Sequence, residues 1–195
     1  MATHKHIALI VGHPDAQGKH FAHALAEAYA DGARAAGHEV KSIDVATLDF
    51  PLLRSQADFE KGQPPETIRQ AQATLRWADH LVLFFPLWLG TMPALLKGFL
   101  EQVFRPGFAF RATSSGLPQK LLAGKSARIV VTMGMPGFVY RWYFRAHGVK
   151  NLKRNILGFC GMRPVRDTII GMVESSDARR KRWLRKIRAL GEAAE

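Results

Sequence analysis

The run His6-Ile7-Ala8-Leu9-Ile10-Val11-Gly12 is apolar at nearly every position. A strand with one face in water alternates apolar and polar residues, so this run predicts a strand that is covered on both faces. It stops at Gly12-His13-Pro14-Asp15, residue types that favour a loop. An alanine-rich stretch from about Lys19 to Ala36 then has helical spacing, with Gly37 as its predicted end cap. Residues 6–37 therefore predict a strand, a loop and a helix.

The rest of the chain repeats this alternation. Further strands are predicted at residues 39–45, 79–85, 126–132 and 165–171, and helices from about Glu66 to Ala78, from about Pro93 to Phe104 and from about 176 to 191. Residues 50–65, with three prolines and a glycine, are predicted to be an irregular loop. Right-handed crossovers place helices on both faces of a parallel sheet. We therefore predict an α/β fold, a flavodoxin-like three-layer sandwich whose five parallel strands have the order 2-1-3-4-5, in a single domain over residues 1–195.

Composition limits the classes of protein to consider. The 195 residues are 47% hydrophobic, enough to bury a sheet between helices. Cys160 is the single cysteine, so no internal disulfide can form and a reduced cytoplasm fits best. No run reaches the roughly 18 apolar residues of a membrane span, and we expect a soluble protein. No metal site is predicted, because the eight histidines are scattered along the sequence and one cysteine cannot anchor zinc.

The net charge is strongly positive, with 28 Lys and Arg against 16 Asp and Glu, which gives +12. Basic residues are concentrated from Arg141 to Arg188, and in the last part of this stretch, from Arg179 onward, apolar residues recur at helical spacing. This pattern predicts a terminal amphipathic helix with a solvated basic face. Alternatively, the face attracts phosphorylated cofactors, an acidic partner or a membrane surface. A basic nucleic-acid-binding protein also fits the charge, but no helix-turn-helix or RNA-binding signature is recognisable, so no nucleic acid is expected.

Three loops are candidates for a binding site, because ligands of open α/β sheets bind beyond the carboxyl ends of the strands. They are residues 13–21, 86–93 and 133–140. In the first loop, glycine lets backbone amides approach a ligand, and the following helix directs its positive end to the same place. The predicted phosphate-binding residues there are His13, Gln17, Gly18, Lys19, His20 and Phe21. An ordinary turn from strand to helix is the alternative.

The second and third loops suit a flat apolar ligand. Prolines fix the backbone of the second loop, and amides around Trp88 and Leu89 are predicted to be available for hydrogen bonds to the ligand. The alternative is that Trp88 belongs to the core. The third loop could complete the pocket from the far side, and a phenol and an imidazole follow at Tyr140 and His147. The predicted contacts of these loops are Pro86, Leu87, Trp88, Leu89, Gly90, Thr132, Gly134, Met135 and Pro136.

The chain resembles the flavodoxin-like NAD(P)H:quinone reductases, a family that includes bacterial quinone reductases and the ancillary oxidoreductases of potassium-efflux systems. The resemblance is strongest in residues 85–99, which begin Phe-Pro-Leu-Trp, and in residues 101–110, Glu-Gln-Val-Phe-Arg-Pro-Gly-Phe-Ala-Phe. Weaker matches are residues 13–15, 49–51, 132–134, 147–148 and 158–161. Together they extend from about residue 6 to residue 171.

This resemblance implies a flavin, FMN with FAD as the alternative, whose phosphate lies in the first loop and whose ring lies between the second and third loops. The family commonly has Ser and Asn where this chain has Gly18 and His20. It implies that Tyr140 and His147 stabilise charge on the flavin during catalysis. It also implies a homodimer that transfers two electrons by a ping-pong mechanism from NAD(P)H through the flavin to a quinone or a similar acceptor.

A flavin-binding regulatory subunit of a membrane potassium-efflux transporter is the alternative function. In that case the basic face from Arg179 to Arg188 would dock on an acidic or lipid surface. Catalysis and regulation are compatible in one protein.

Overall fold

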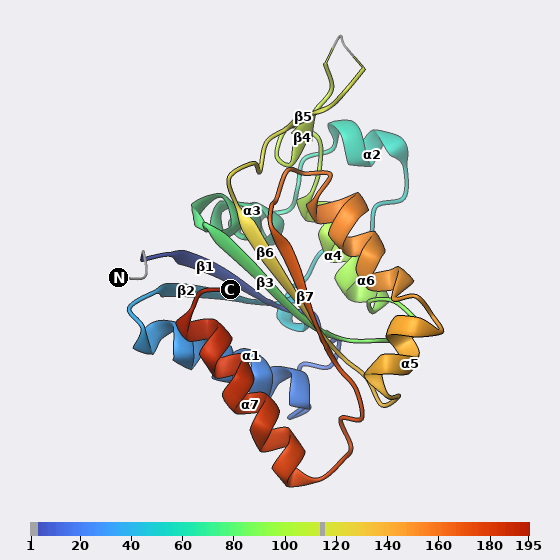
Figure 1. The fold of residues 1–195 in the computed structure, drawn as a ribbon. Helices are drawn as coiled ribbons and strands as arrows, with labels where there is room; N and C mark the ends of the chain where they lie inside the picture. The colour runs from blue at the N-terminus through green and yellow to red at the C-terminus, as the bar shows by residue number, and fades with distance from the viewer. Residues whose placement is uncertain (1–3, 114–115) are drawn as a thin grey trace.

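The framework of the protein is a five-stranded parallel sheet (Figure 1). The computed structural model describes residues 4–113 and 116–195. The strands lie in the order β2-β1-β3-β6-β7. Their bounds are His6–Val11 for β1, Glu39–Asp44 for β2, His80–Pro86 for β3, Ser126–Thr132 for β6 and Val165–Ile170 for β7. Since β6 and β7 are the fourth and fifth strands of this sheet along the chain, the predicted fold class and strand order are confirmed.

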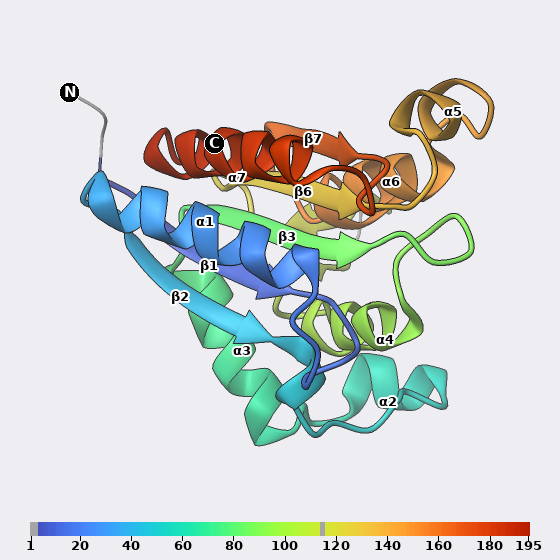
Figure 2. The same ribbon diagram turned by 90° about the horizontal axis from the view of Figure 1, so that it is seen from below.

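Helices cover both faces of the sheet (Figures 1 and 2). Two long helices, α1 and α7, pack on one face over an apolar cluster that includes Leu9, Leu25 and Ile187. The helices α3, α4 and α6 pack on the other face over a second cluster. The bounds are Phe21–Ala35 for α1, Glu66–Trp77 for α3, Ala94–Val103 for α4, His147–Asn151 for α6 and Asp177–Glu192 for α7. None of the helices in the described part of the chain is long and apolar enough to cross a membrane.

The helix ends agree with the sequence-based prediction where the capping residue is distinctive. Gly37 has a φ of +86°, and beyond it the amide of His38 donates to the carbonyl of Ala33 at 2.9 Å. This is the hydrogen bond of a glycine-capped helix end, so the predicted cap of α1 is confirmed. The basic terminal helix predicted at about 176–191 is also confirmed, since α7 spans Asp177–Glu192.

The interpretation of residues 50–65 as wholly irregular is wrong, because they contain the short helix α2, Gln56–Lys61. Its start is fixed by Ser55, whose Oγ accepts a hydrogen bond from the amide of Asp58 at 3.1 Å. In the third predicted loop, α5 begins at Gly137 and continues past the loop to Trp142. Other short elements were not predicted: β4, Phe110–Arg111, pairs with β5, Gln119–Lys120, while η1 spans Val45–Thr47 and η2, a π-helical stretch, spans Leu152–Leu157.

The sequence motif at residues 101–110 holds the 50–65 segment in place. Gln102 Nε2 donates to the carbonyl of Pro51 at 2.6 Å. The guanidinium of Arg105 is buried and donates to the carbonyls of Asp58 at 3.0 Å and Gly62 at 2.6 Å. Buried charged donors require such partners. This motif therefore fixes the loop that crosses from β2 to α3.

The C-terminal residues pack against α1 and against Lys5, the residue that precedes β1. Tyr29 Oη donates to the carbonyl of Glu195 at 3.3 Å, and Lys5 Nζ donates to the carbonyl of Ala194 at 3.1 Å. The helices α1 and α7 also meet through glycines. A Cβ on Gly32 would lie 2.1 Å from the carbonyl oxygen of Arg188, and one on Gly191 would lie 2.1 Å from that of Tyr29. The two backbones therefore touch where no side chain fits.

We predict that Gly191→Ala destabilises the protein by about 1–3 kcal/mol, the usual cost of overpacking. The added methyl group would push α7 away from the backbone of α1, since the atom that it meets is a carbonyl oxygen. Urea unfolding followed by circular dichroism measures the effect.

Gly98→Ala in α4 is the matched control. A Cβ on Gly98 would lie 2.6 Å from Leu52 Cδ2, the end of an exposed side chain that can turn away, and 3.8 Å from Phe50 Cε2, an ordinary van der Waals contact. Alanine then stabilises the helix by about 0.5–1 kcal/mol. Equal unfolding midpoints for the Gly191→Ala variant and the unmodified protein would contradict the close contact.

Candidate functional site

The three predicted loops meet at one edge of the sheet, because β1, β3 and β6 are parallel and end side by side. The amide of Leu87 donates to the carbonyl of Thr132 at 2.7 Å, which joins the second loop to the third. The rings of His13 and Trp88 meet edge to face with centroids 6.3 Å apart, which joins the first loop to the second. The sequence-based prediction that the three loops lie at one edge is confirmed.

Asp15 organises the first loop. One of its carboxylate oxygens accepts the amides of Gln17 at 2.9 Å and Gly18 at 3.2 Å, and the other lies 2.7 Å from Nε2 of His20. These hydrogen bonds, with that of His20 first, lower the pKa of the Asp15 carboxyl group. The predicted role of the Gly18 amide therefore changes, since in this structure it serves Asp15. The sequence indicates this turn, because Asp15 stands two residues before Gln17 and three residues before Gly18, the usual spacing of an Asx turn.

A pair of stacked histidines lies beside this turn. The rings of His13 and His20 are 3.7 Å apart at an interplanar angle of 18°. Burial, and to a smaller extent the charges of the nearby His20 and His23, lowers the pKa of His13 and so favours its neutral imidazole. Nδ1 of His13 accepts the amide of Asp15 at 3.2 Å, which leaves Nε2 as the protonated nitrogen. His13 therefore presents one hydrogen-bond donor.

The start of α1 completes the first loop. Its N-cap residue, His20, makes no capping hydrogen bond with its side chain, and the first turn contains no acidic residue. The positive end of a 15-residue helix is thus available to an anion. Lys19 beside it is exposed. Phe21 packs its ring against the core, so only its backbone could contact a ligand.

The second loop forms a tight turn. The amide of Trp88 donates to the carbonyl of Thr91 at 2.9 Å, and the reverse hydrogen bond measures 3.0 Å. Both central residues have positive φ, +46° at Leu89 and +82° at Gly90. The prediction that the Trp88 amide is available to a ligand is therefore wrong, because the turn uses it. The alternative that Trp88 belongs to the core is also wrong, since half of its surface is exposed and Leu89 is fully exposed.

The third loop exposes the backbone at Gly134 and the flexible side chain of Met135 to solvent. Thr132 is buried, whereas Gly134 and Met135 are exposed just beyond the end of β6. Pro136 is the N-cap residue of α5. The carbonyl of Met135 accepts the amide of Met172 at 3.1 Å, which fixes the loop against the segment after β7.

Tyr140 connects the second loop to the segment after α5. Its hydroxyl donates to the carbonyl of Gly90 at 3.2 Å and accepts the amide of Val149 at 3.3 Å. The side chain is buried, and burial raises the pKa of its phenol. Gly148 lies close by, since a Cβ on it would be 2.4 Å from the carbonyl oxygen of Gly90. The structure thus brings Tyr140 to the turn, with its hydroxyl engaged on both sides, and places His147 at the exposed start of α6.

Comparison with known proteins identifies the family. The sequence description of the flavodoxin-like fold family matches residues 5–191. The chain belongs to this family. An FMN-dependent NADH:quinone oxidoreductase of Shewanella amazonensis is 32% identical over 146 residues, which are 70% of this chain and 71% of the relative. The resemblance to flavodoxin-like NAD(P)H:quinone reductases that was stated from the sequence is thereby confirmed.

Two further proteins match over nearly the whole chain. An uncharacterised NAD(P)H oxidoreductase of Haemophilus influenzae is 25% identical over 185 residues, 93% of this chain and 91% of the relative. The solved structure of an NAD(P)H:quinone oxidoreductase from Methanothermobacter marburgensis superposes with a TM-score of 0.81 at 25% identity and covers 99% of this chain and 100% of that one. The family relationship therefore includes all five strands.

We predict that Tyr140→Phe weakens the link between the second loop and α6. The substitution leaves the Val149 amide and the Gly90 carbonyl without this hydroxyl, which costs about 1–3 kcal/mol for a buried group. Hydrogen exchange followed by mass spectrometry should show faster exchange in the peptide that contains Val149.

Tyr143→Phe is the control, because the Tyr143 side chain is 80% exposed. It should leave both stability and exchange unchanged. If the Tyr140→Phe variant matches this control, the hydroxyl does not support the turn.

Proposed function

We propose that this flavodoxin-like protein is an FMN-dependent NAD(P)H oxidoreductase that reduces quinones or similar acceptors. The observation that carries the proposal is the convergence of three loops at the carboxyl edge of β1, β3 and β6, tied together by the Leu87 to Thr132 hydrogen bond and the contact between His13 and Trp88. In doubly wound folds this edge is where ligands bind. The relative named as an FMN-dependent NADH:quinone oxidoreductase supports the same function.

The first loop fits the phosphate of the flavin. The positive end of α1, one donor on His13 and the charge of Lys19 would surround an anion there. Asp15 is the exception, since its carboxylate already accepts the amides of Gln17 and Gly18. The phosphate would therefore bind beside Asp15, at the helix end and the imidazoles, and not in the Asx turn itself.

The second and third loops fit the flavin ring. Trp88 and Leu89 present exposed apolar surface from one side, and Gly134, Met135 and Pro136 form the other side. A bound flavin would accept a hydride from NAD(P)H and pass two electrons to the acceptor. Because the same ring face would serve both reactants in turn, we propose a ping-pong order. FAD is the alternative cofactor, and the FMN dependence of the Shewanella amazonensis relative favours FMN.

In this proposal Tyr140 and His147 have different roles. The buried hydroxyl of Tyr140 holds the carbonyl of Gly90, so it keeps the turn in position as a positioning residue. His147 is exposed beside this turn, next to Gly148, which packs on Gly90. We propose that His147 is the group that faces the reduced ring and stabilises its charge.

A homodimer is part of the proposal. Large apolar side chains are exposed around the site, with exposed fractions of 67% at Phe138, 79% at Trp142 and 80% at Tyr143. Several large exposed apolar side chains close together in the sequence are typical of a protein interface. A second copy that covered these side chains would also cover Leu89 and close the open side of the site.

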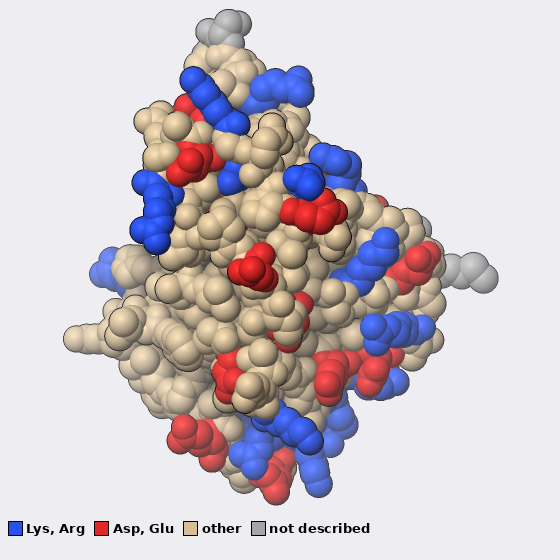
Figure 3. Space-filling model, turned by 180° about the vertical axis from the view of Figure 1, so that it is seen from behind, with Lys and Arg blue, Asp and Glu red and all other residues tan. Residues whose placement is uncertain are grey.

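Binding to nucleic acid is less well supported, and the regulatory function stays a prediction. On the face that is turned away from the viewer in Figure 1, basic and acidic side chains are interspersed (Figure 3). Along α7, Arg180 pairs with Asp177 and Arg188 pairs with Glu192 at 3.4 Å. These pairs reduce the positive field that a polyanion would need.

The test of the proposed function is flavin uptake followed by turnover. The purified protein should be yellow or take up FMN, and it should oxidise NADPH or NADH faster than free FMN does when benzoquinone is present. Mass spectrometry of the released flavin decides between FMN and FAD. A protein that takes up neither flavin would refute the proposal.

Lys19→Gln tests the first loop, since it removes one charge from the proposed phosphate site. We expect the dissociation constant for FMN to rise about tenfold, the effect of about 1.4 kcal/mol. Lys61→Gln at the end of α2 is the control and should bind FMN as the unmodified protein does. Riboflavin, which has no phosphate, should bind equally to all three proteins.

Sedimentation velocity tests the homodimer. The unmodified protein should sediment as a dimer, and Trp142→Glu should shift it towards monomer, because it places a charge in the apolar interface. Leu52→Glu changes another exposed apolar residue, outside the α5 region, and serves as the control. A monomeric unmodified protein would overturn this part of the proposal.

A further inference from the structure

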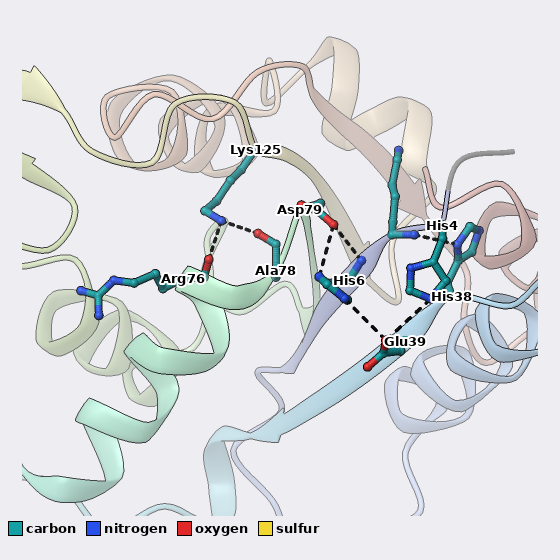
Figure 4. A network of polar contacts seen from close by, with 9 residues as sticks. His4, His6, His38, Glu39, Arg76, Ala78, Asp79 and Lys125 are labelled. Atoms are coloured by element: carbon teal, nitrogen blue, oxygen red, sulfur yellow. Dashed lines mark hydrogen bonds and ion pairs between the residues drawn. The ribbon is translucent and has the colours of Figure 1, made fainter.

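A cluster of histidines and carboxylates lies at the opposite edge of the sheet, where the strands begin (Figure 4). His6 is the first residue of β1, Glu39 is the first residue of β2, and Asp79 directly precedes β3. His4 stands two residues before His6. Successive residues of an extended chain alternate in direction, so His4 and His6 face the same side. The register of the two strands pairs His6 with Glu39.

The three side chains already approach the geometry of a metal site. Nε2 of His4 lies 3.7 Å from Oε1 of Glu39, and Nε2 of His6 lies 3.5 Å from the same oxygen. One ligand atom from each residue lies within 4.8 Å of the other two. In a tetrahedral zinc site with bonds of about 2.0–2.1 Å, neighbouring ligand atoms are about 3.3 Å apart. Closing on an ion therefore requires only small side-chain movements.

The ring of His6 is held in the orientation that a ligand needs. It stacks on Trp77 with centroids 4.5 Å apart and an interplanar angle of 25°. Its Nδ1 lies 3.7 Å from Oδ2 of Asp79, and this oxygen accepts the amide of His6 at 2.9 Å. A carboxylate on the far nitrogen of a metal-binding histidine fixes its tautomer and raises its basicity. Asp79 is placed to act in this way while Nε2 faces Glu39.

Neighbouring groups support the cluster without joining it. His38 is buried, its Nδ1 accepts the amide of Lys5 at 3.2 Å, and its Nε2 lies 3.3 Å from the carbonyl of Glu192. Both of its nitrogens are therefore used. The amide contact anchors the backbone between His4 and His6, and Nζ of Lys5 is drawn away to the carbonyl of Ala194.

We propose that His4, His6 and Glu39 form a surface site for a divalent transition-metal ion of the zinc type, with a fourth position open to solvent. Two imidazoles and a carboxylate are ligands that suit Zn²⁺. The ion joins the beginnings of β1 and β2 and so stabilises the folded protein by mass action. The site lies at the other edge of the sheet from the flavin loops, so it does not depend on the proposed oxidoreductase function.

The decisive experiment titrates Zn²⁺ into the full-length chain, without a polyhistidine tag and after removal of metal by a chelator. Isothermal titration calorimetry should give one ion per chain, and the melting temperature should rise with Zn²⁺ concentration. His4→Ala and Glu39→Gln should each weaken binding at least tenfold. Both residues are exposed, so these variants should fold as the unmodified protein does, which circular dichroism checks.

His20→Ala is the matched control, because it removes another imidazole that pairs with a carboxylate, that of Asp15 at 2.7 Å. It should retain the affinity for Zn²⁺. Absence of heat and of a melting shift in the unmodified protein would overturn the proposal and leave the cluster as ion pairs. Binding that His4→Ala and Glu39→Gln do not weaken would equally overturn it, because the ion would then bind elsewhere.

Discussion

All five strands of the central sheet run in the same direction, and the rest of the molecule depends on this constraint. A parallel sheet needs a crossover between each pair of strands, and the crossovers here run through α1, α3, α4 and α6, while α7 follows the last strand. The same constraint collects every carboxyl end at one edge and every amino end at the other. Loops that are far apart in sequence, such as those at His13, Trp88 and Thr132, are therefore neighbours. The two candidate binding sites occupy opposite edges for this reason.

The fold could be predicted because its signals are local. Apolar runs at residues 6–12, 79–85 and 126–132 reveal buried strands directly, and Gly37 marks a helix end through its need for positive φ. The short elements were harder to predict. α2 has six residues and depends on one serine cap, and α6 and η2 are stabilised by packing against the sheet more than by their own sequence. Tertiary contacts decide such segments, and a single sequence does not display them.

The location of the candidate site could be predicted from the sequence, but the hydrogen-bond partners of its backbone amides could not. Strand ends give the location, whereas the partners of each amide depend on turn geometry. Trp88 and Gly18 show the difference, because their amides go to Thr91 and Asp15 and not to an open pocket. His4 and His6 stand two residues apart, but no metal site was predicted from the sequence. Their partner Glu39 is not apparent there, since strand register brings them together across more than thirty residues.

The packing of α7 on α1 has a consequence for synthesis of the chain. The apolar side of α1 faces the sheet and α7, yet α7 begins only at Asp177. The ribosome synthesises the N-terminal part first. α1 and the sheet face beneath it are therefore made long before α7, the helix that packs over them. During that interval α7 does not yet cover Tyr29 or the backbone at Gly32, which it contacts closely in the finished fold. During most of translation the nascent chain thus exposes the apolar surface of α1 that α7 later covers. A chaperone at the ribosome would encounter this surface.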